Sequence, residues 1–317
     1  MEVLMSEQKR EIGSTGIFVS PVALGCWPIA GMTSLDVNDD DSRATIRAAI
    51  DSGINFLDTA HCYGAEGESE VLIGEVIADC RDDVVIATKG GIHWDSDIVR
   101  HNDGSPDRII KECEISLQRM KIDVNDLHYL HSPDPSVPVE ESATAFAELL
   151  ESGKIRSVGV SNFKVDEIER FHSVCPVSAF QPRYNMLQRD IEKELVPWCL
   201  EHNVSVMNYW PLMKGLLAGK IRRGHEFDPK DKRLSYDIFH GEKFEQAQQL
   251  VDRLDVVAAE CDKTVAQVVI NWNMQRPGIG SVLCGAKRAW QIEETAGAMG
   301  WRLSDDQMSR IENGITD

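Results

Sequence analysis

Four polar side chains that can move protons stand where short apolar runs of the sequence end. Asp58 lies near the end of the run Ile54–Thr59, and Tyr63 follows shortly after it. Lys89 ends the run Val84–Lys89, and His131 ends the run Leu127–His131. If these runs are neighbouring parallel strands, their carboxyl ends meet at one face of the sheet, so we expect the four side chains to lie together.

The chemistry that these residue types support is proton donation. The phenol of Tyr63 has a reference pKa of about 10, and a nearby ammonium group such as that of Lys89 lowers this pKa toward neutrality, where a general acid works best. Asp58 is suited to keep Lys89 charged and oriented, and His131 is suited to hydrogen-bond a carbonyl oxygen. This chemistry requires no thiol or serine nucleophile.

These runs belong to a set of eight short apolar segments. Each is bounded by turn residues, and most are apolar almost throughout, which is typical of strands buried on both faces of a parallel sheet. The predicted strands are Val22–Gly25, Ile54–Thr59, Val84–Lys89, Leu127–His131, Ile155–Ser161, Ala179–Tyr184, Val204–Tyr209 and Ile279–Cys284.

Amphipathic segments between these runs predict helices. They cover Asp41–Asp51, Glu68–Ala78, Ser105–Lys121, Glu140–Ser152, Val165–His172, Asp190–His202, Lys243–Cys261, Thr264–Gln275, Arg288–Met299 and Ser304–Asn313. Alternation of eight strands with helices favours a closed barrel over an open sheet. We therefore expect an α/β protein in which residues 1–317 form a single (β/α)8 TIM barrel domain. A short N-terminal hairpin, from Lys9–Ile12 and Ile17–Ser20, precedes it, and extra helices lie near the C-terminus.

Composition excludes several classes of function. The 33 basic and 52 acidic residues give a net charge of −19, which repels nucleic acid and anionic lipid surfaces. Eight cysteines without any C-x-x-C pair indicate reduced thiols. We find neither a signal peptide nor an apolar run long enough for a membrane helix, so we expect a cytoplasmic protein. No set of residues has the spacing of a metal site, so we expect no metal.

Several segments resemble the motifs of the aldo-keto reductases. They are Gly53–Gly64 (GINFLDTAHCYG), Thr88–Gly91 (TKGG), Leu130–Asp134 (LHSPD), Gly159–Phe163 (GVSNF), Gln181–Leu187 (QPRYNML), Tyr209–Leu212 (YWPL) and Gly215–Lys220 (GLLAGK). The matches follow one order along nearly the whole chain. The sequence most resembles the bacterial branch related to the inositol-utilisation reductase and the potassium-channel β subunits.

The resemblance implies an NADPH-dependent enzyme that reduces an aldehyde or ketone to an alcohol, reversibly, by hydride transfer. Asp58, Tyr63, Lys89 and His131 would form the catalytic tetrad, with Tyr63 as the proton donor. The nicotinamide carboxamide would be held by Ser161, Asn162 and Gln181, and the nicotinamide ring would stack on Tyr209. The cofactor would also lie against the segments that contain Trp210, Pro211, Leu212, Gly215 and Gly285.

The far end of the cofactor would lie near Lys287, with Glu294 on the adenine and Gln291 beside it. Lys287, Arg288, Lys220 and Arg233 are candidates for the adenosine 2′-phosphate, because Lys and Arg are the natural partners of a phosphate. These cations favour NADPH, although NAD stays possible. Two departures from the family pattern stand out: Thr295 replaces an asparagine that follows the glutamate in many relatives, and Trp210 replaces a serine.

Trp27 and Trp94 are candidates to line the substrate pocket, since they lie near the ends of the first and third predicted strands. The partner is then a small carbonyl or alcohol compound, and both a monomer and a homo-oligomer stay open.

The intact tetrad favours an enzyme over one alternative, a regulatory protein of the same fold that binds cofactor with little turnover. A dinucleotide-binding dehydrogenase with a G-x-G-x-x-G turn is disfavoured, because Gly278 and Gly280 have no third glycine.

Overall fold

The computed structural model describes residues 9–32, 34–97, 99–313 and 315. Its centre is a closed barrel in which each strand pairs in parallel with the next along the chain, and the last pairs with the first. The barrel strands are β3 (Val22–Gly25), β4 (Phe56–Asp58), β5 (Val85–Gly90), β8 (Leu127–Leu130), β9 (Val158–Ser161), β10 (Ala179–Gln181), β11 (Ser205–Asn208) and β12 (Ile279–Gly285). The predicted (β/α)8 barrel is thus confirmed.

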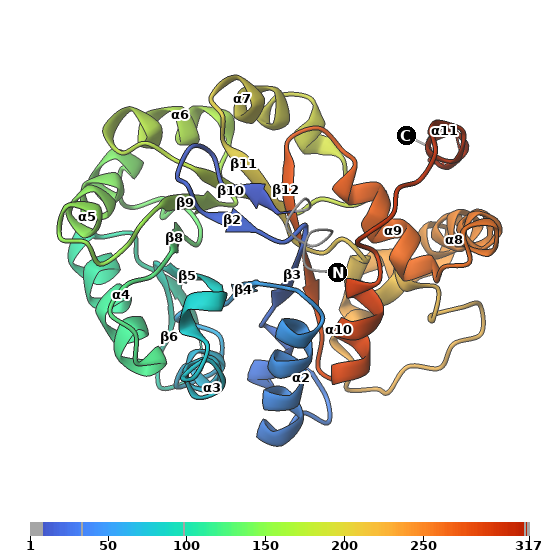
Figure 1. The fold of residues 1–317 in the computed structure, drawn as a ribbon, viewed down its shortest axis with the longest axis horizontal. Coiled ribbons are helices and arrows are strands. Elements are labelled where there is room, and N and C mark those ends of the chain that lie inside the picture. The colour runs from blue at the N-terminus through green and yellow to red at the C-terminus, as the bar shows by residue number, and fades with distance from the viewer. Residues whose placement is uncertain (1–8, 33, 98, 314, 316–317) are drawn as a thin grey trace.

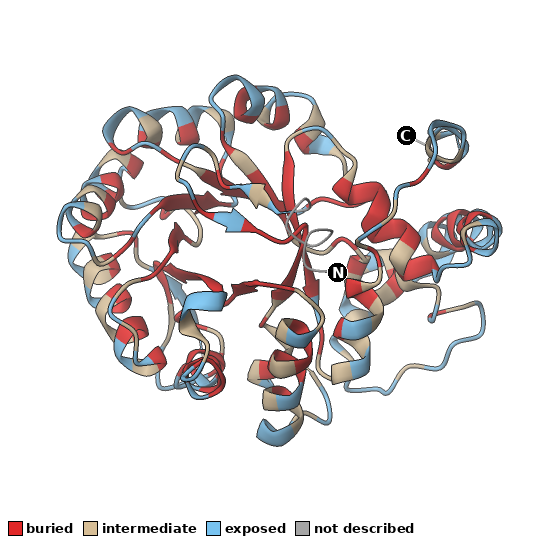
Figure 2. Ribbon diagram, viewed as in Figure 1, coloured by how far each residue is buried: buried red, intermediate tan, exposed pale blue. Residues whose placement is uncertain are grey.

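Helices surround the barrel, as Figure 1 shows. They are α2 (Asp39–Asp51), α3 (Glu68–Val76), α4 (Pro106–Met120), α5 (Val139–Glu151), α6 (Val165–Val174), α7 (Leu195–Glu201), α8 (Gly241–Cys261), α9 (Val265–Met274), α10 (Ala289–Ala296) and α11 (Asp305–Glu312). Their buried residues face the strands and their exposed residues face outward (Figure 2). Two apolar layers result, one between strands and helices and one inside the barrel.

The predicted helix over 190–202 is interrupted. A short 3₁₀ turn covers Asp190–Glu192, and α7 begins only at Leu195. Pro197 therefore falls in the first turn of the helix, where its missing N–H breaks no hydrogen bond. Between the predicted strand Val204–Tyr209 and the predicted helix Lys243–Cys261, the chain also forms 3₁₀ turns at Lys232–Ser235 and Asp237–Phe239.

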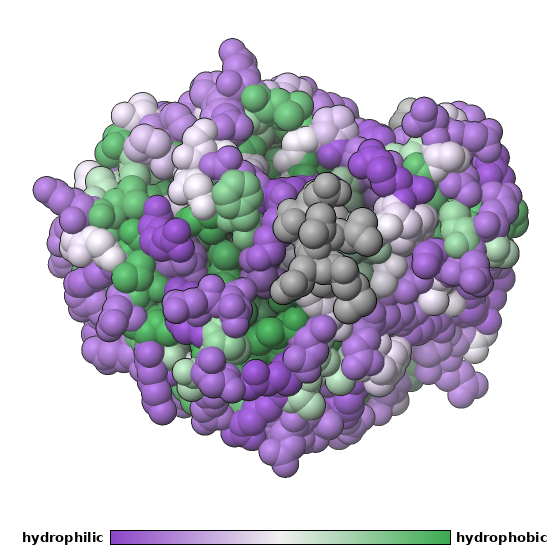
Figure 3. All heavy atoms as spheres, in the orientation of Figure 1, coloured by the Kyte–Doolittle hydropathy of each residue, from purple (hydrophilic) through white to green (hydrophobic). Residues whose placement is uncertain are grey.

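The predicted N-terminal hairpin is present as β1 (Arg10–Glu11) and β2 (Phe18–Val19). It closes the end of the barrel where the strands begin, and it faces the viewer in Figure 1. Arg10 donates hydrogen bonds to the carbonyls of Ile279 and Met274, at 2.7 and 2.8 Å. Ile12 and Ile17 of the hairpin pack against the apolar side chains inside the barrel. Hydrophilic side chains cover much of this face (Figure 3).

A second hairpin, which the sequence analysis did not predict, follows β5. Its strands are β6 (Ile92–Trp94) and β7 (Arg100–Asn102), which pair in antiparallel fashion. Trp94 lies directly opposite Arg100. Because the hairpin leaves the carboxyl end of β5, it forms one wall at the barrel mouth, on the end opposite β1 and β2.

Candidate active site

The carboxyl ends of neighbouring strands bring Asp58, Tyr63, Lys89 and His131 together at the barrel mouth. The ammonium nitrogen of Lys89 lies 2.6 Å from Oδ1 of Asp58 and 3.4 Å from the hydroxyl of Tyr63. It also donates to the Thr59 carbonyl at 2.7 Å. The rings of Tyr63 and His131 have their centroids 5.8 Å apart. The four residue types therefore share one site, as their positions at strand ends predicted.

The ion pair between Lys89 and Asp58 is almost completely removed from water, with 0% and 2% of the two side chains exposed. Burial raises the pKa of Asp58, while the charge of Lys89 and hydrogen bonds from Lys89 and Gln181 oppose that rise. Oδ2 of Asp58 accepts from the Gln181 side chain at 2.7 Å. Each carboxylate oxygen thus has its own donor, which a buried charge requires.

Tyr63 has a different electrostatic environment from the one expected. Burial raises its pKa well above the usual value, and the charge of Asp58 raises it further. The expected lowering by Lys89 is outweighed, because Asp58 neutralises the ammonium and lies closer to it than the phenol does. The phenol consequently keeps its proton at neutral pH, as a proton donor must.

His131 is neutral at physiological pH. Burial lowers its pKa well below the usual range, and the charges of Lys89 and Arg100 lower it further. Nδ1 of His131 lies 3.5 Å from the sulfur of Cys62. Burial raises the pKa of Cys62 to about 12, so Cys62 is present as a thiol. The sequence alone suggests no role for Cys62, because its contact is with a residue 69 positions away.

A connected row of polar groups runs along the ends of β9 and β10. Ser161 donates to the backbone carbonyl of Gln181 at 2.8 Å. The Asn162 amide donates to the His131 carbonyl at 3.0 Å and accepts from the Tyr209 hydroxyl at 2.8 Å. Asn162 has a φ of 63°, a left-handed conformation that asparagine tolerates better than most residues. The Gln181 amide is directed toward Asp58, a contact that the sequence did not suggest.

The chain after β11 turns sharply around the residues predicted to lie against the cofactor. Trp210, Met213, Lys214 and Gly215 all have positive φ values. The ammonium of Lys214 lies 4.0 Å from the ring centroid of Trp210, a cation–π distance. Pro211 is buried and Leu212 is half-buried. A methyl group at Gly215 would be in van der Waals contact with Arg233 and Ile221, at 3.7 and 3.8 Å, and the φ of 91° is a conformation that favours glycine.

The four cations predicted for the 2′-phosphate differ in their partners. Lys220 forms an ion pair with Glu294, and Arg233 forms one with Asp231. Arg288 lies 3.4 Å from a carboxylate oxygen of Asp41 and donates to the Asp36 carbonyl at 2.6 Å.

Lys287 differs from the other three, because its ammonium donates at 2.7 Å to a neutral group, the carbonyl of Leu35. Its backbone N–H donates to Gln291 at 2.9 Å. Lys287 therefore has the least neutralised charge of the four.

Two other predicted cofactor residues have distinct surroundings. Thr295 is buried, and its hydroxyl donates to the Ile292 carbonyl of its own helix at 3.1 Å. Gly285 ends β12, and a methyl group there would lie 3.0 Å from the ring of Pro28. The glycine thus permits close contact between the end of β12 and the segment after β3.

Trp27 and Trp94 flank Tyr63, as their positions near strand ends suggested. The ring of Trp27 meets that of Tyr63 edge to face with centroids 5.0 Å apart. The indole N–H of Trp94 donates to the carbonyl of Cys62 at 2.7 Å. Both indoles are half-buried, so part of their apolar surface stays exposed beside the phenol.

A layer of buried charges supports the loops on which the site depends. Glu70 accepts from Thr88 at 2.6 Å and pairs with Arg119 at 3.0 Å. Glu112 accepts from the Gly91 backbone at 2.6 Å and from Arg108 at 2.5 Å. These contacts hold the end of β5 on both sides of Lys89.

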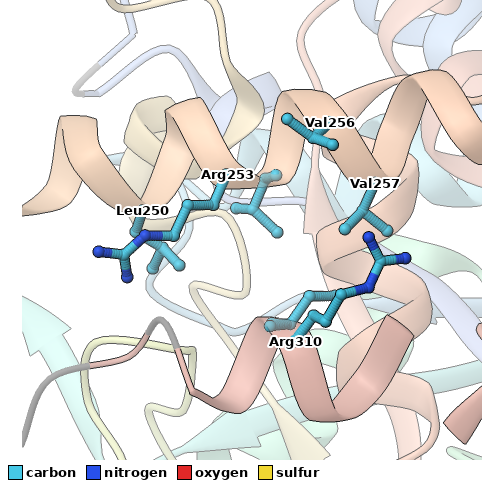
Figure 4. A pocket seen from close by; sticks show the side chains of 7 residues that line it. Leu250, Arg253, Val256, Val257 and Arg310 are labelled. Carbon is cyan, nitrogen blue, oxygen red and sulfur yellow. The ribbon is translucent and has the colours of Figure 1, made fainter. Parts of the chain in front are cut away.

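A pocket elsewhere on the molecule lies between α8 and α11 (Figure 4). Its lining is mainly apolar, with the guanidinium groups of Arg253 and Arg310 at the rim, and it lies away from the strand ends. It lacks the convergent acid and base groups found at the barrel mouth. No cluster of three or more possible metal-ligating side chains occurs among the residues that the structure describes.

The fold and the site define an oxidoreductase of the barrel type, and comparison with known proteins gives its family. The aldo/keto reductase family matches residues 21–315, and this chain belongs to it. The chain is 36% identical over 314 residues to aldo-keto reductase YhdN of Bacillus subtilis, covering 96% of this chain and 94% of the relative. It is 30% identical to a probable aldo-keto reductase 1 of Glycine max, covering 97% and 89%.

Solved structures agree with this assignment. The glycerol dehydrogenase AKR11B4 of Gluconobacter oxydans superposes with a TM-score of 0.91 at 34% identity, covering 98% of this chain and 95% of that one. The holo form of AKR11C1 from Bacillus halodurans shares the fold, with a TM-score of 0.83 at 24% identity and 98% and 96% coverage. The protein is thus an NAD(P)-dependent aldo-keto reductase that acts on carbonyl and alcohol groups.

Proposed function

We propose that this protein reduces an aldehyde or ketone with NADPH and that Tyr63 donates the proton. The observation that carries the proposal is the contact chain from Asp58 through Lys89 to Tyr63 at the barrel mouth. A bound nicotinamide supplies the hydride for the carbonyl carbon. The phenol of Tyr63 supplies the proton for the carbonyl oxygen, and the buried ammonium of Lys89 stabilises the phenolate that remains.

His131 orients the substrate in this proposal. Because the Cys62 thiol is protonated, its S–H can donate to Nδ1 of His131 across 3.5 Å. The ring proton then resides on Nε2, where it can donate a hydrogen bond to the carbonyl oxygen of the substrate. Cys62 is therefore a positioning residue that selects the useful tautomer of His131.

The polar row at β9 and β10 suits the nicotinamide carboxamide. Ser161 and Asn162 present hydroxyl and amide groups at the strand ends, and Tyr209 offers a half-buried ring for stacking. Gln181 has its amide directed to Asp58, so we assign it a second task, that of fixing the carboxylate that holds Lys89.

The preference for NADPH rests mainly on Lys287. Its ammonium has only a carbonyl partner, whereas Lys220, Arg233 and Arg288 each have a carboxylate nearby. A phosphate can replace a neutral acceptor at little electrostatic cost, and its charge strengthens the hydrogen bond. Glu294 and Gln291 lie on the same helix and suit the adenine.

We further propose that residues 1–317 form one domain and that the protein is cytoplasmic. The cysteines are all unpaired, which suits a reducing compartment. No helix of the described chain is long and apolar enough to span a membrane.

The decisive experiment measures the loss of NADPH absorbance with a panel of carbonyl compounds. The panel includes glyceraldehyde, because a structural relative is a glycerol dehydrogenase. Tyr63→Phe removes one hydroxyl and keeps the ring, so kcat should fall at least ~100-fold. The affinity for NADPH, measured by fluorescence titration, should change little. A protein that binds NADPH but turns over no carbonyl would instead be a regulatory binding protein, and normal turnover by Tyr63→Phe would exclude Tyr63 as the donor.

A further inference from the structure

Two arginines stand at the barrel mouth without an assigned task. Arg100 lies on β7 directly opposite Trp94 of β6, and opposite residues of an antiparallel pair point to the same face. Trp94 contacts the backbone of Cys62, next to Tyr63. Arg100 therefore lies on the face of the hairpin that looks onto the site.

Arg183 lies across the mouth from this hairpin. It forms an isolated parallel bridge with Tyr209, the residue proposed to stack on the nicotinamide. Side chains alternate along a strand, so Arg183 shares a side with Gln181, whose amide reaches Asp58. The neighbouring Tyr184 points the other way and donates to Glu192 at 2.5 Å. Arg183 thus rises above Gln181 on the inner side of the mouth.

Neither guanidinium has a counter-ion in the part of the chain that the structure describes. Most arginines of this acidic chain pair with a carboxylate, such as Arg43 with Glu75 and Arg170 with Glu140. Arg100 and Arg183 are both exposed, and neither forms an ion pair or side-chain hydrogen bond with the residues that the structure describes. In a chain with a net charge of −19, two unpaired cations at one opening make a local region of positive potential that attracts anions.

Both charges act on groups inside the site. Burial raises the pKa of Tyr209, and the charges of Arg183 and Arg100 oppose that rise. Arg100 also contributes to the low pKa of His131. Electrostatic interactions weaken with distance, so these effects agree with the strand positions that place Arg100 on the side of His131 and Tyr209 and Arg183 beside Tyr209. Trp27 and Trp94 supply apolar surface between them and Tyr63.

We propose that the site selects carbonyl compounds that carry an anionic group, a carboxylate or a phosphate, held between Arg100 and Arg183. The proposal rests on the reductase function proposed above and names its substrate class. Hydride adds to the carbonyl carbon and the proton of Tyr63 to the oxygen, so NADPH is oxidised and the carbonyl becomes an alcohol. The anionic group does not react; it places the carbonyl and draws the substrate into the mouth.

The test compares matched pairs of aldehydes that differ in charge. 4-Carboxybenzaldehyde and its methyl ester form the carboxylate pair, and glyceraldehyde 3-phosphate and glyceraldehyde form the phosphate pair. The wild type should show a higher kcat/KM for the anion in at least one pair, and the pair with the larger ratio identifies the anion. Salt of ~0.5 M should reduce that ratio, because exposed charges are screened.

Variants assign the effect to the two arginines. Arg100→Gln and Arg183→Gln should each lower the ratio of kcat/KM for the anionic substrate to kcat/KM for the neutral substrate by about tenfold, which corresponds to about 1.4 kcal/mol. Arg100→Lys should retain part of the preference. Arg310→Gln changes the net charge equally on α11, remote from the mouth, and should change neither substrate.

Binding measurements keep this proposal separate from the reductase function. Quenching of tryptophan fluorescence by 4-(hydroxymethyl)benzoate and by its methyl ester needs no turnover, and the acid should bind more tightly only while both arginines are present. Absence of turnover with all aldehydes, despite this preference, would refute the reductase function alone. The anion proposal would be overturned if the wild type and the double variant Arg100→Gln with Arg183→Gln preferred the anionic ligand to the same extent. It would also be overturned if the variants raised only the KM for NADPH, because the arginines would then serve the cofactor.

Discussion

Replacing Lys89 with methionine tests the buried ion pair most directly. Lys89→Met keeps an unbranched chain of similar length but removes the charge that faces Asp58 at 2.6 Å. Asp58 would be left as a buried carboxylate with Gln181 as its remaining side-chain donor. Breaking a buried pair by removing one partner costs about 3–5 kcal/mol, a large part of a typical folding stability of about 5–15 kcal/mol.

The stability loss should depend on pH in a defined direction. Without Lys89, only the hydrogen bond from Gln181 opposes the effect of burial, so the pKa of the Asp58 carboxyl in the folded state rises further above its unfolded value. A carboxyl with a raised pKa favours folding at low pH, and this contribution is lost as the pH rises through the folded pKa. Lys89→Met should therefore be closer to wild-type stability at acidic pH than at alkaline pH, as measured by urea unfolding.

A double variant separates stability from catalysis. Asp58→Asn removes the stranded charge while keeping an oxygen for Gln181, so Asp58→Asn with Lys89→Met should recover most of the lost stability. Turnover should not recover, because the ammonium beside Tyr63 is absent, and kcat should stay at least ~100-fold below wild type. Recovery of turnover in the double variant would refute the coupling between Lys89 and Tyr63. Wild-type stability of Lys89→Met alone would refute the argument from burial.

Three further results follow from other contacts. Cys62→Ala should lower kcat about 2–10-fold, which is the value of one neutral hydrogen bond, whereas Cys62→Ser should retain most activity. Nitrogen NMR of His131 should show that the single Nε2–H tautomer is lost only in the alanine variant, and an unchanged tautomer there would refute the positioning role of Cys62. Lys287→Ala should weaken NADPH by about tenfold or more and leave NADH nearly unchanged in fluorescence titrations; equal weakening of both would exclude a phosphate contact. Burial lowers the pKa of His128 to about 3, so below the reference pKa of about 6.5 this histidine takes up a proton when the protein unfolds, and the stability should fall as the pH decreases. His128→Leu should reduce the slope of the unfolding free energy against pH by about 1.4 kcal/mol per pH unit between about pH 4 and 5.5. An unchanged slope would contradict a neutral buried ring.

Much of the fold follows from the sequence pattern because the barrel strands are buried on both sides. An uninterrupted apolar run such as Val85–Ala87 is typical of a strand that is buried on both faces of a parallel sheet. The second hairpin was missed for the opposite reason. Arg100, His101 and Asn102 are exposed, so β7 carries no apolar alternation, and its pairing with β6 becomes visible only in three dimensions.

The site was predictable to the extent that it depends on strand ends. Asp58, Lys89 and His131 lie where parallel strands finish, so the fold class alone brings them together. The bond from Gln181 to Asp58 and the approach of Cys62 to His131 join residues 123 and 69 positions apart. Such contacts depend on side-chain rotamers across the barrel, for which a single sequence has no pattern. The rise in the pKa of Tyr63 was also not predictable, because the sequence does not show how deeply the phenol is buried.

The closure of the barrel has a consequence for synthesis on the ribosome. β3 pairs with β12, with Val22 opposite Val282, so the first strand of the barrel cannot complete its pairing until the last barrel strand has been synthesised. The hairpin of β1 and β2 also depends on β12 for its attachment, because Arg10 donates a hydrogen bond to the Ile279 carbonyl. Until then the nascent chain presents β3 as an open edge that can pair with another chain. The barrel therefore closes only after β12 has been synthesised, and chains that stop before β12 would retain β3 as an unpaired edge.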